Sequence, residues 1–213
     1  MRKTFDTELQ DLSLEMISMA AAAEDAIDMV TRSLAGSDPE GARSTIEMAR
    51  GMEETEREIE NHCMRLLLQQ QPVARDLRTI SAALKMVTDL QRIGDQASNI
   101  AELSILLSQQ TRVQELADIR IMSQKAAAMV KRAILAYANR DVDGAKAVIA
   151  LDDEVDELFL KIKQELVDLI LSDHTAADQA IDLIIIAKYL ERIADHGVNI
   201  AQWAIFSVTG QLQ

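Results

Sequence analysis

Apolar residues recur at intervals of three and four along most of the chain, which predicts amphipathic helices. In the first such segment, residues 6–34, the recurring apolar positions are Leu9, Leu12, Met16, Met19, Ala23, Ile27 and Val30. Segments with similar patterns cover residues 39–70, 73–108, 113–139, 142–171 and 175–208. A helix of about thirty residues is roughly 45 Å long. The pattern therefore predicts six long helices joined by short loops.

Turn-forming and capping residues mark the ends of these segments. Gly36 follows the first segment and is a natural left-handed cap. Asp38 is expected to cap the second helix, and Pro39 takes its first position, where the missing N–H costs nothing. Pro72 pushes the preceding residue out of the α region and separates the second helix from the third. Residues 175–178, Thr-Ala-Ala-Asp, resemble a capping box for the last helix, with Asp in place of Glu.

The chain contains an internal duplication. Of the twelve positions from Leu90 to Ala101, seven are identical to the positions one hundred residues later. The identical pairs are Leu90 and Leu190, Arg92 and Arg192, Ile93 and Ile193, Asp95 and Asp195, Asn99 and Asn199, Ile100 and Ile200, and Ala101 and Ala201. Such self-similarity indicates one supersecondary unit used twice.

The duplication extends upstream with a different spacing. Residues 38–46 align with residues 141–149 at a separation of 103 residues, which places the turn at 139–141 opposite that at 37–38. A three-residue difference therefore lies between the two matched stretches, most simply in the loop at 69–75 against that at 172–178. We expect two tandem three-helix bundles, residues 1–109 and 110–213, which pack directly on each other because no linker separates them.

Composition supports an all-α fold and limits the partners. The 213 residues are 48% hydrophobic and 27% charged but only 3% aromatic, with seven Gly and two Pro, which is typical of helices and not of sheets. The net charge of −13 argues against binding to nucleic acid, whose phosphate backbone attracts basic proteins. Cations or a basic protein surface suit this charge better.

Cysteine usage and hydropathy indicate the compartment. Cys63 is the single cysteine, so no intrachain disulfide can form. The first residues lead into Asp6 and Glu8 without the apolar region of a signal peptide. Even the apolar stretch 181–190 contains Asp182 and Lys188, so no segment is suited to membrane insertion. We therefore expect a soluble, cytoplasmic protein.

The duplicated helices each carry a polar stripe roughly 80° wide. In the first half this stripe contains Gln91, Asp95, Asn99 and Glu102, and in the second half it contains Lys188, Glu191, Asp195, Asn199 and Gln202. Glu191 and Asp195 lie one turn apart, where like charges repel by a few tenths of a kcal/mol. A bound cation could offset this repulsion, and so could Lys188 or the arginines at 92 and 192. The alternative is a solvated charged face with local ion pairs.

A further acidic group lies on the second predicted helix. It consists of Glu53, Glu54, Glu56 and Glu60, of which Glu56 and Glu60 are one turn apart and are candidate ligands. At a separation of 103 residues their counterparts are Asp156, Glu157, Phe159 and Lys163. We therefore expect this acidic pair in the first half alone.

Several chemistries find no support in the sequence. A ferritin-like di-metal centre needs Glu three residues before His, and no Glu precedes His62, His174 or His196 in this way. Cys63 and the scattered histidines do not have the spacing of a zinc site. His196 points about 100° away from Asp195, which favours a surface histidine. Phosphate-binding loops and nucleophile elbows are absent, so we expect no enzymatic activity.

Three motifs together resemble the PhoU family of phosphate-uptake regulators. They are residues 89–100 (DLQRIGDQASNI), residues 190–200 (LERIADHGVNI) and the connecting residues 71–78 (QPVARDLR). The resemblance covers nearly the whole chain and implies two similar three-helix bundles. It also implies a non-enzymatic cytoplasmic protein that restrains phosphate uptake and the phosphate-starvation response. The implied partners are a PhoR-type sensor kinase, a PstB-type transporter ATPase and a second copy of the chain in a homodimer.

The resemblance further implies metal ions, iron or zinc, on motifs of the form Glu/Asp-x-x-x-Asp. Glu191 and Asp195 match this motif in full, and Asp95 matches it in the first half. Gln91 stands where the family usually has Glu and is a weaker, neutral ligand, so the second half is the stronger candidate. Two alternatives to a signalling adaptor remain open: a metal-buffering helical protein and a helical scaffold without a ligand.

Overall fold

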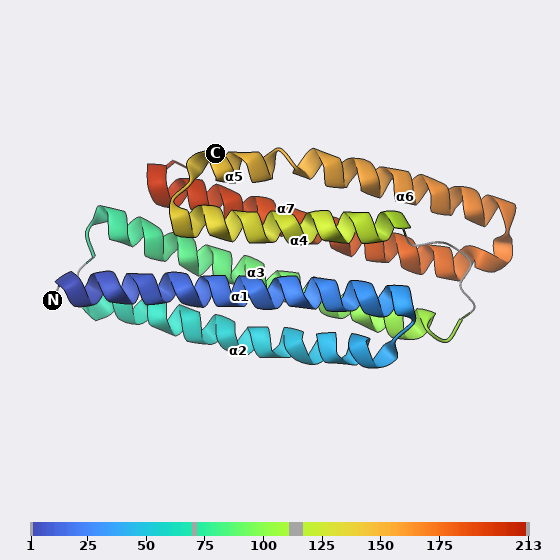
Figure 1. Cartoon of the computed structure of the whole chain (residues 1–213), viewed down its shortest axis with the longest axis horizontal. Helices are drawn as coiled ribbons and strands as arrows, with labels where there is room; N and C mark the ends of the chain where they lie inside the picture. The colour runs from blue at the N-terminus through green and yellow to red at the C-terminus, as the bar shows by residue number, and fades with distance from the viewer. Residues whose placement is uncertain (1, 70–71, 111–116, 212–213) are drawn as a thin grey trace.

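The computed structural model describes residues 2–69, 72–110 and 117–211. The helices are α1 (Arg2–Gly36), α2 (Pro39–Gln69), α3 (Ala74–Leu107), α4 (Ala117–Asn139), α5 (Val142–Ile149), α6 (Asp152–Ser172), the short 3₁₀ helix η1 (His174–Ala176) and α7 (Ala177–Thr209). Helices α1 to α3 form one bundle and α4 to α7 form the other (Figure 1). This confirms the predicted all-α fold with two three-helix bundles. No described helix is long and apolar enough to cross a membrane.

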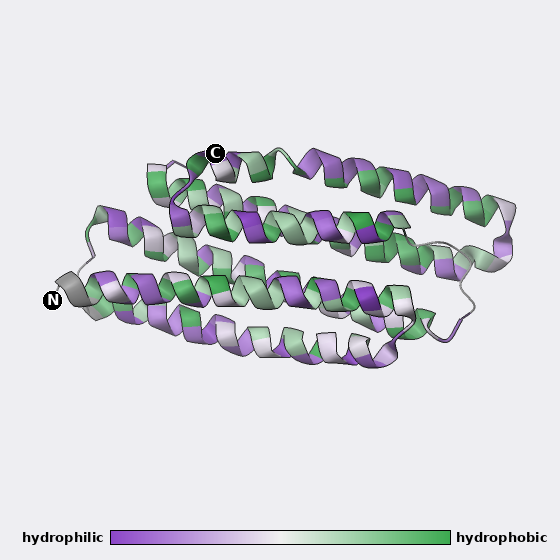
Figure 2. Ribbon diagram, in the orientation of Figure 1, coloured by the Kyte–Doolittle hydropathy of each residue, from purple (hydrophilic) through white to green (hydrophobic). Residues whose placement is uncertain are grey.

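The core lies along α3 and α7, the helices that carry the duplicated stretch. Helix α3 packs against α1, α2 and α7, and α7 packs against α3, α4, α5 and α6. Hydrophobic and hydrophilic residues occur together on each helix (Figure 2), and buried apolar side chains from both bundles form the core. Equivalent side chains are fully or almost fully buried in both halves, as in the pairs Leu90 and Leu190, Ile93 and Ile193, and Ile100 and Ile200. Burial of each such side chain contributes about 1.5–3 kcal/mol.

The two halves also meet through α1 and α4, so they share one continuous core. Direct packing of the bundles was expected from the absence of a linker. Because α3 and α7 are each held on several sides, side chains that project from them are placed by rigid backbone. This matters for the polar stripes, which lie on these two helices.

The turns after α1 and α4 are built alike. Ser37 and Arg140 have positive φ angles of 52° and 57°, and the following Asp38 and Asp141 cap the next helix. The Asp38 carboxylate accepts a hydrogen bond from the Glu40 N–H at 3.1 Å, and Asp141 accepts one from the Gly144 N–H at 2.9 Å. The predicted cap at Asp38 is confirmed.

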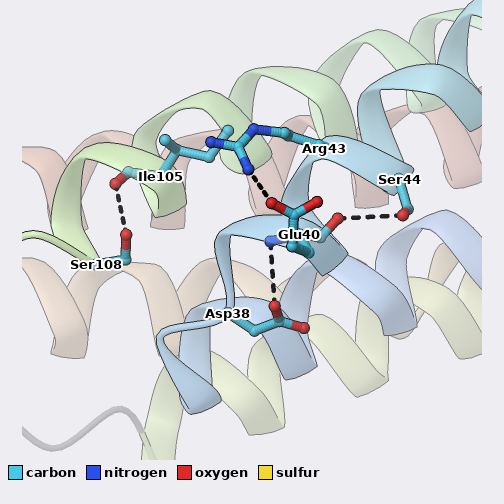
Figure 3. A network of polar contacts seen from close by, with 6 residues as sticks. All are labelled: Asp38, Glu40, Arg43, Ser44, Ile105 and Ser108. Atoms are coloured by element: carbon cyan, nitrogen blue, oxygen red, sulfur yellow. Dashed lines mark hydrogen bonds and ion pairs between the residues drawn. The ribbon is translucent and has the colours of Figure 1, made fainter.

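The prediction that Gly36 is the left-handed residue is wrong. Gly36 completes α1, and the chain turns at Ser37, where the Asp38 N–H reaches back to the Ser33 carbonyl at 2.9 Å. Helix α1 therefore includes Gly36, and the residue with a positive φ is the next one, Ser37. The first turn of α2 is then fixed by short side-chain contacts of Glu40 with Arg43 and of Ser44 with the Glu40 carbonyl (Figure 3).

The fifth predicted helix, residues 142–171, is broken in the structure. Helix α5 ends at Ile149, and the Leu151 N–H bonds to the Val148 carbonyl in a tighter turn. Helix α6 then begins with three acidic residues, Asp152, Asp153 and Glu154, in its first turn. Negative side chains stabilise a helix N-terminus, so they favour a new start at this place. Neither Gly nor Pro lies in the junction, so the residues that usually mark a turn did not indicate the break.

The start of α7 also differs from expectation. Asp173, rather than Thr175, accepts the capping bonds, from the N–H and the hydroxyl of Thr175 at 2.9 and 2.6 Å. These bonds produce η1, after which α7 begins without a side-chain cap. Counted back from the duplicated residues Leu90 and Leu190, α3 begins three residues earlier than α7 does. This agrees with the predicted position of the three-residue difference between the halves. The predicted start of the fourth helix at residue 113 lies outside the described residues.

Candidate functional site

Four carboxylates gather where α6 packs against α7. Asp152 and Asp156 lie one turn apart on α6, and Glu191 and Asp195 lie one turn apart on α7. We call these four residues the acidic cluster of the second half. The structure thus brings Glu191 and Asp195, the predicted ligands, into the field of two further carboxylates on the neighbouring helix.

The cluster raises the pKa values of three of its carboxyl groups. Burial, followed by repulsion from Asp156 and Asp195, raises the pKa of Asp152 to about 6. Burial and the charge of Glu191 raise the pKa of Asp156, and a hydrogen bond between these two groups acts in the same direction. Burial and Glu191 likewise raise the pKa of Asp195. A cation close to the cluster would relieve this repulsion.

Lys188 supplies a positive charge beside the cluster. Its ammonium contacts the Glu191 carboxylate and lies 5.2 Å from the centre of the Phe159 ring. Lys188 also opposes the rise in the pKa values of Asp156 and Asp195. One exposed lysine offsets only part of the charge of four carboxylates, so the cluster stays strongly negative.

A related but weaker cluster lies between α2 and α3 in the first half. Gln91 donates a hydrogen bond through its amide nitrogen to Asp95 at 2.8 Å. Burial and the charge of Glu60 raise the pKa of Glu56, and Asp95 adds to the effect, while a hydrogen bond from Thr88 opposes it. The structure therefore brings Glu56, Glu60 and Asp95 into one electrostatic group, with Gln91 at its edge.

The second half lacks a counterpart of the Glu56 and Glu60 pair, as expected, because Phe159 and Lys163 occupy these positions. The second half has its own pair, Asp152 and Asp156, at the positions that correspond to Ala49 and Glu53. The pair has moved along the helix by about two turns relative to Glu56 and Glu60, and Phe159 now faces Lys188 where Glu56 faces Thr88. The acidic spacing at 152 and 156 was visible in the sequence, but its orientation became clear only from the packing of α6 on α7.

The donor chemistry of the acidic cluster suits a hard cation, because carboxylate oxygens are its only ligands. Among the described residues, no group of three or more His, Cys, Asp and Glu side chains is arranged to hold a metal ion. The side chains of the cluster would therefore have to turn toward a cation, and Glu191 would have to leave Lys188. The charge of the cluster suits a cation, while the side-chain conformations do not form a finished site.

The interpretation of His196 as a surface histidine is wrong. Its Nδ1 lies 2.9 Å from an Oδ1 of Asp89, a residue of α3 that is only 7% exposed. The amide of Asn199 approaches the same oxygen at 3.4 Å. His196 and Asn199 therefore face the other half of the chain, and Asn199 does not belong to the acidic stripe. The sequence placed His196 away from Asp195 correctly but could not show which helix it would meet.

Comparisons with known proteins agree with this architecture. The profile of the PhoU domain family matches residues 16–104 and 119–204. The phosphate-specific transport system accessory protein PhoU homolog of Clostridium acetobutylicum is 35% identical over 211 residues, which cover 99% of this chain and 96% of that protein. The homolog of the same description from Aquifex aeolicus is 36% identical, with 96% of this chain and 93% of that protein covered.

Solved structures show the same fold. The crystal structure of PhoU from Pseudomonas aeruginosa matches with a TM-score of 0.93 and 32% identity, covering 97% of this chain and all of that one. The phosphate transport system regulatory protein from Streptococcus pneumoniae matches with a TM-score of 0.90 at 23% identity, a likeness of fold.

Proposed function

Because the chain belongs to the PhoU family, we propose that it is a non-enzymatic regulator of a phosphate-specific transport system, acting in the cytoplasm as an adaptor. It would restrain phosphate uptake and starvation signalling by contacting both a PstB-type transporter ATPase and a PhoR-type sensor kinase. The observation that carries this proposal is the full-length match of both bundles to relatives that are named accessory proteins of this transport system.

Two features of the fold support an adaptor. The halves share a continuous core, so a contact made on one bundle is held in a fixed relation to a contact made on the other. The two acidic clusters give the helix faces uncompensated charge that a basic partner surface would complement. Coupling between importer and kinase then requires that the two partners favour different arrangements of the complex.

Deletion of the gene, followed by complementation, tests the regulatory role. Phosphate uptake and a starvation-response reporter should both rise when the gene is deleted and return to normal with the intact gene. Purified importer ATPase and the cytoplasmic part of the kinase should each be retained by the immobilised chain. Unchanged uptake and reporter activity after deletion would contradict the proposal.

A multivalent metal ion, of the iron or zinc class, is the second part of the proposal. Asp152, Asp156, Glu191 and Asp195 would hold it in the second half, and Asp95, Glu56 and Glu60, with Gln91 as a neutral ligand, would hold a weaker one in the first. The raised pKa values of Asp152, Asp156 and Asp195 support a cation there, because it would relieve their repulsion. An oxygen-only ligand set favours iron over zinc.

Elemental analysis of the chain, purified without a metal-binding tag, tests this part. The intact protein should contain metal, and the Glu191→Gln/Asp195→Asn variant should contain less. A Glu157→Gln variant changes a charge on the exposed side of α6 and is the matched control. Equal metal contents in all three proteins would remove these residues from the proposal.

A metal-buffering protein without a signalling role is the alternative, and the acidic clusters are the observation that favours it. The same genetic experiment separates the two functions. A buffer would change the metal tolerance of the cell on deletion while phosphate uptake stayed the same. Light scattering of the purified chain tests the homodimer, which should have twice the mass of 23.6 kDa.

A further inference from the structure

The starts of α1 and α3 lie at the same end of the molecule as the ends of α4 and α7 (Figure 1). A cavity of about 680 Å³ is lined by residues from these four helix ends. Its lining residues come from all four helices and from the connection before α3, which is part of the 71–78 motif. Tyr137 holds this end together, because its hydroxyl donates a hydrogen bond to the Thr79 carbonyl. A cavity of this size is typical of sites for small organic molecules.

Charged residues of both signs line the cavity. Arg75 and Arg140 line it, and Arg78 lies close enough to affect Arg140. Two carboxylates, Asp6 and Asp76, also line the cavity. The two arginines and two aspartates of the lining balance, and Arg78 beside Arg140 adds a third arginine, in a chain whose net charge is −13.

The charges of Arg75 and Arg78 both repel the Arg140 guanidinium group. Burial, followed by the charge of Arg75, lowers the pKa of Arg140; Arg78 acts in the same direction, and Tyr137 and Asp76 oppose the effect. Within the described part of the chain, no ion pair joins any of the three to a carboxylate. Unpaired cations that are partly withdrawn from water are unfavourable unless an anion joins them.

Arg78 has an unsatisfied hydrogen-bond donor. Its Nε is buried and has no hydrogen-bond partner among the described residues. Gly210 packs against the same side chain, since a Cβ placed on it would lie 3.3 Å from the Arg78 Cδ and Nη1. Arg78 is therefore held in place with an unused donor. A guanidinium group is suited to oxyanions, which accept two of its N–H groups at once.

The rest of the lining is apolar. Leu9, Leu14, Ile17 and Val73 contribute to it, and Leu14 and Val73 are 63% and 52% exposed. Exposed aliphatic side chains at the rim of a cavity gain stability when a ligand covers them. The site thus combines arginine side chains with an apolar wall.

We propose that this cavity binds a small molecule with a multiply charged oxyanion group, held by Arg75 and Arg140 with Arg78 close to Arg140, and with its remaining part against the apolar wall. The cavity is separate from the acidic clusters, and binding here does not depend on the adaptor role. The shared chemistry includes free inorganic phosphate and organic phosphates, which the test distinguishes.

Calorimetric titration of the full chain at low ionic strength, where charge interactions are least screened, tests the proposal. The probes are inorganic phosphate and ATP, each titrated separately. Saturable one-to-one binding of either probe is the expected result. Binding of phosphate identifies the free ion as a ligand, and binding of ATP alone shows that a single phosphate group is too small and that an organic phosphate is the ligand. Absence of saturable binding with both probes overturns the proposal.

Variants show whether binding occurs in this cavity. Arg75→Gln and Arg140→Asn should each weaken binding at least tenfold. Arg50→Gln is the control, because Arg50 is exposed on α2 and loses the same charge. Thermal unfolding of each variant confirms its fold, and the probe should raise the melting temperature of the control but not of the cavity variants. Equal affinity in all proteins contradicts binding between these arginines.

Discussion

The carboxylate of Asp89 and the imidazole of His196 lie 2.9 Å apart across the interface between the two halves, although 107 residues separate them in the chain. Asp89 is almost fully buried, and the His196 side chain is only 15% exposed. Asn199 approaches the same carboxylate oxygen. The contact joins α3 to α7 at the centre of the molecule, where both helices carry the duplicated stretch.

Replacement of Asp89 by Ala should lower the free energy of unfolding by about 1–3 kcal/mol, because His196 and Asn199 would lose a buried acceptor. Urea denaturation followed by circular dichroism measures the change. Asp95→Ala is the matched control on the same helix. Its carboxylate lies in the acidic group of the first half, so its loss should change stability by no more than about 0.5 kcal/mol. Equal effects of the two substitutions would show that the Asp89 contact carries no special weight.

Asp152 predicts a dependence of stability on pH. Its pKa is raised from 3.8 to about 6, so the folded chain keeps a proton that the unfolded chain has released between about pH 4 and 6. The free energy of unfolding should therefore fall as the pH rises through this window, and the cost is complete above pH 6. Asp152→Asn should stabilise the protein at pH 7 by about 1 kcal/mol, since solvent screening reduces the effect of this partly exposed group.

The comparison is between denaturation curves at pH 4.5 and pH 7, conditions chosen to lie within and above that window. Glu157→Gln removes a charge from the exposed side of the same helix and should not produce this difference between the two pH values. A stabilisation of Asp152→Asn that is the same at both pH values would contradict a raised pKa as its cause.

Much of this architecture could be predicted from the sequence because it follows from local rules. Apolar periodicity gave the long helices, and the duplication gave the two bundles. The cap at Asp38 follows from side-chain chemistry that acts within a few residues. The position of the three-residue difference followed from the two separations between matched residues, 103 in the upstream stretch and 100 in the downstream stretch.

The features that could not be predicted depend on which helices meet. Asp152 and Asp156 became part of a cluster through the packing of α6 against α7. His196 contacts Asp89, which lies on a helix of the other half. The break at 150–151 has no Gly or Pro, and only the acidic first turn of α6 accompanies it. The cavity beside Arg140 needed four helix ends to be placed together, which no pattern within one segment contains.

Protons and cations should compete for the acidic cluster of the second half. The apparent affinity for a divalent cation such as Mn²⁺ should fall several-fold when the pH is lowered from 7 to 5, because Asp152, with its pKa of about 6, then carries a proton. Calorimetric titration at the two pH values measures this difference. The Asp152→Asn variant should bind more weakly at pH 7 and show a smaller pH dependence, since Asp156 and Asp195 also have raised pKa values. A pH dependence that is unchanged in this variant would assign it to other groups.

Arg140 occupies a backbone conformation that favours glycine, with a φ of 57°. A left-handed conformation costs a residue with a side chain about 1–2 kcal/mol, and burial together with Arg75 and Arg78 makes the Arg140 charge unfavourable as well. Arg140→Gly should therefore raise the free energy of unfolding by about 1 kcal/mol, measured by urea denaturation without added anions. Asn139→Gly is the control, because Asn139 is the last residue of α4 and glycine has a low helix propensity. That variant should be unchanged or slightly less stable, and a loss of stability in both variants would mean that the Arg140 side chain contributes more than its conformation costs.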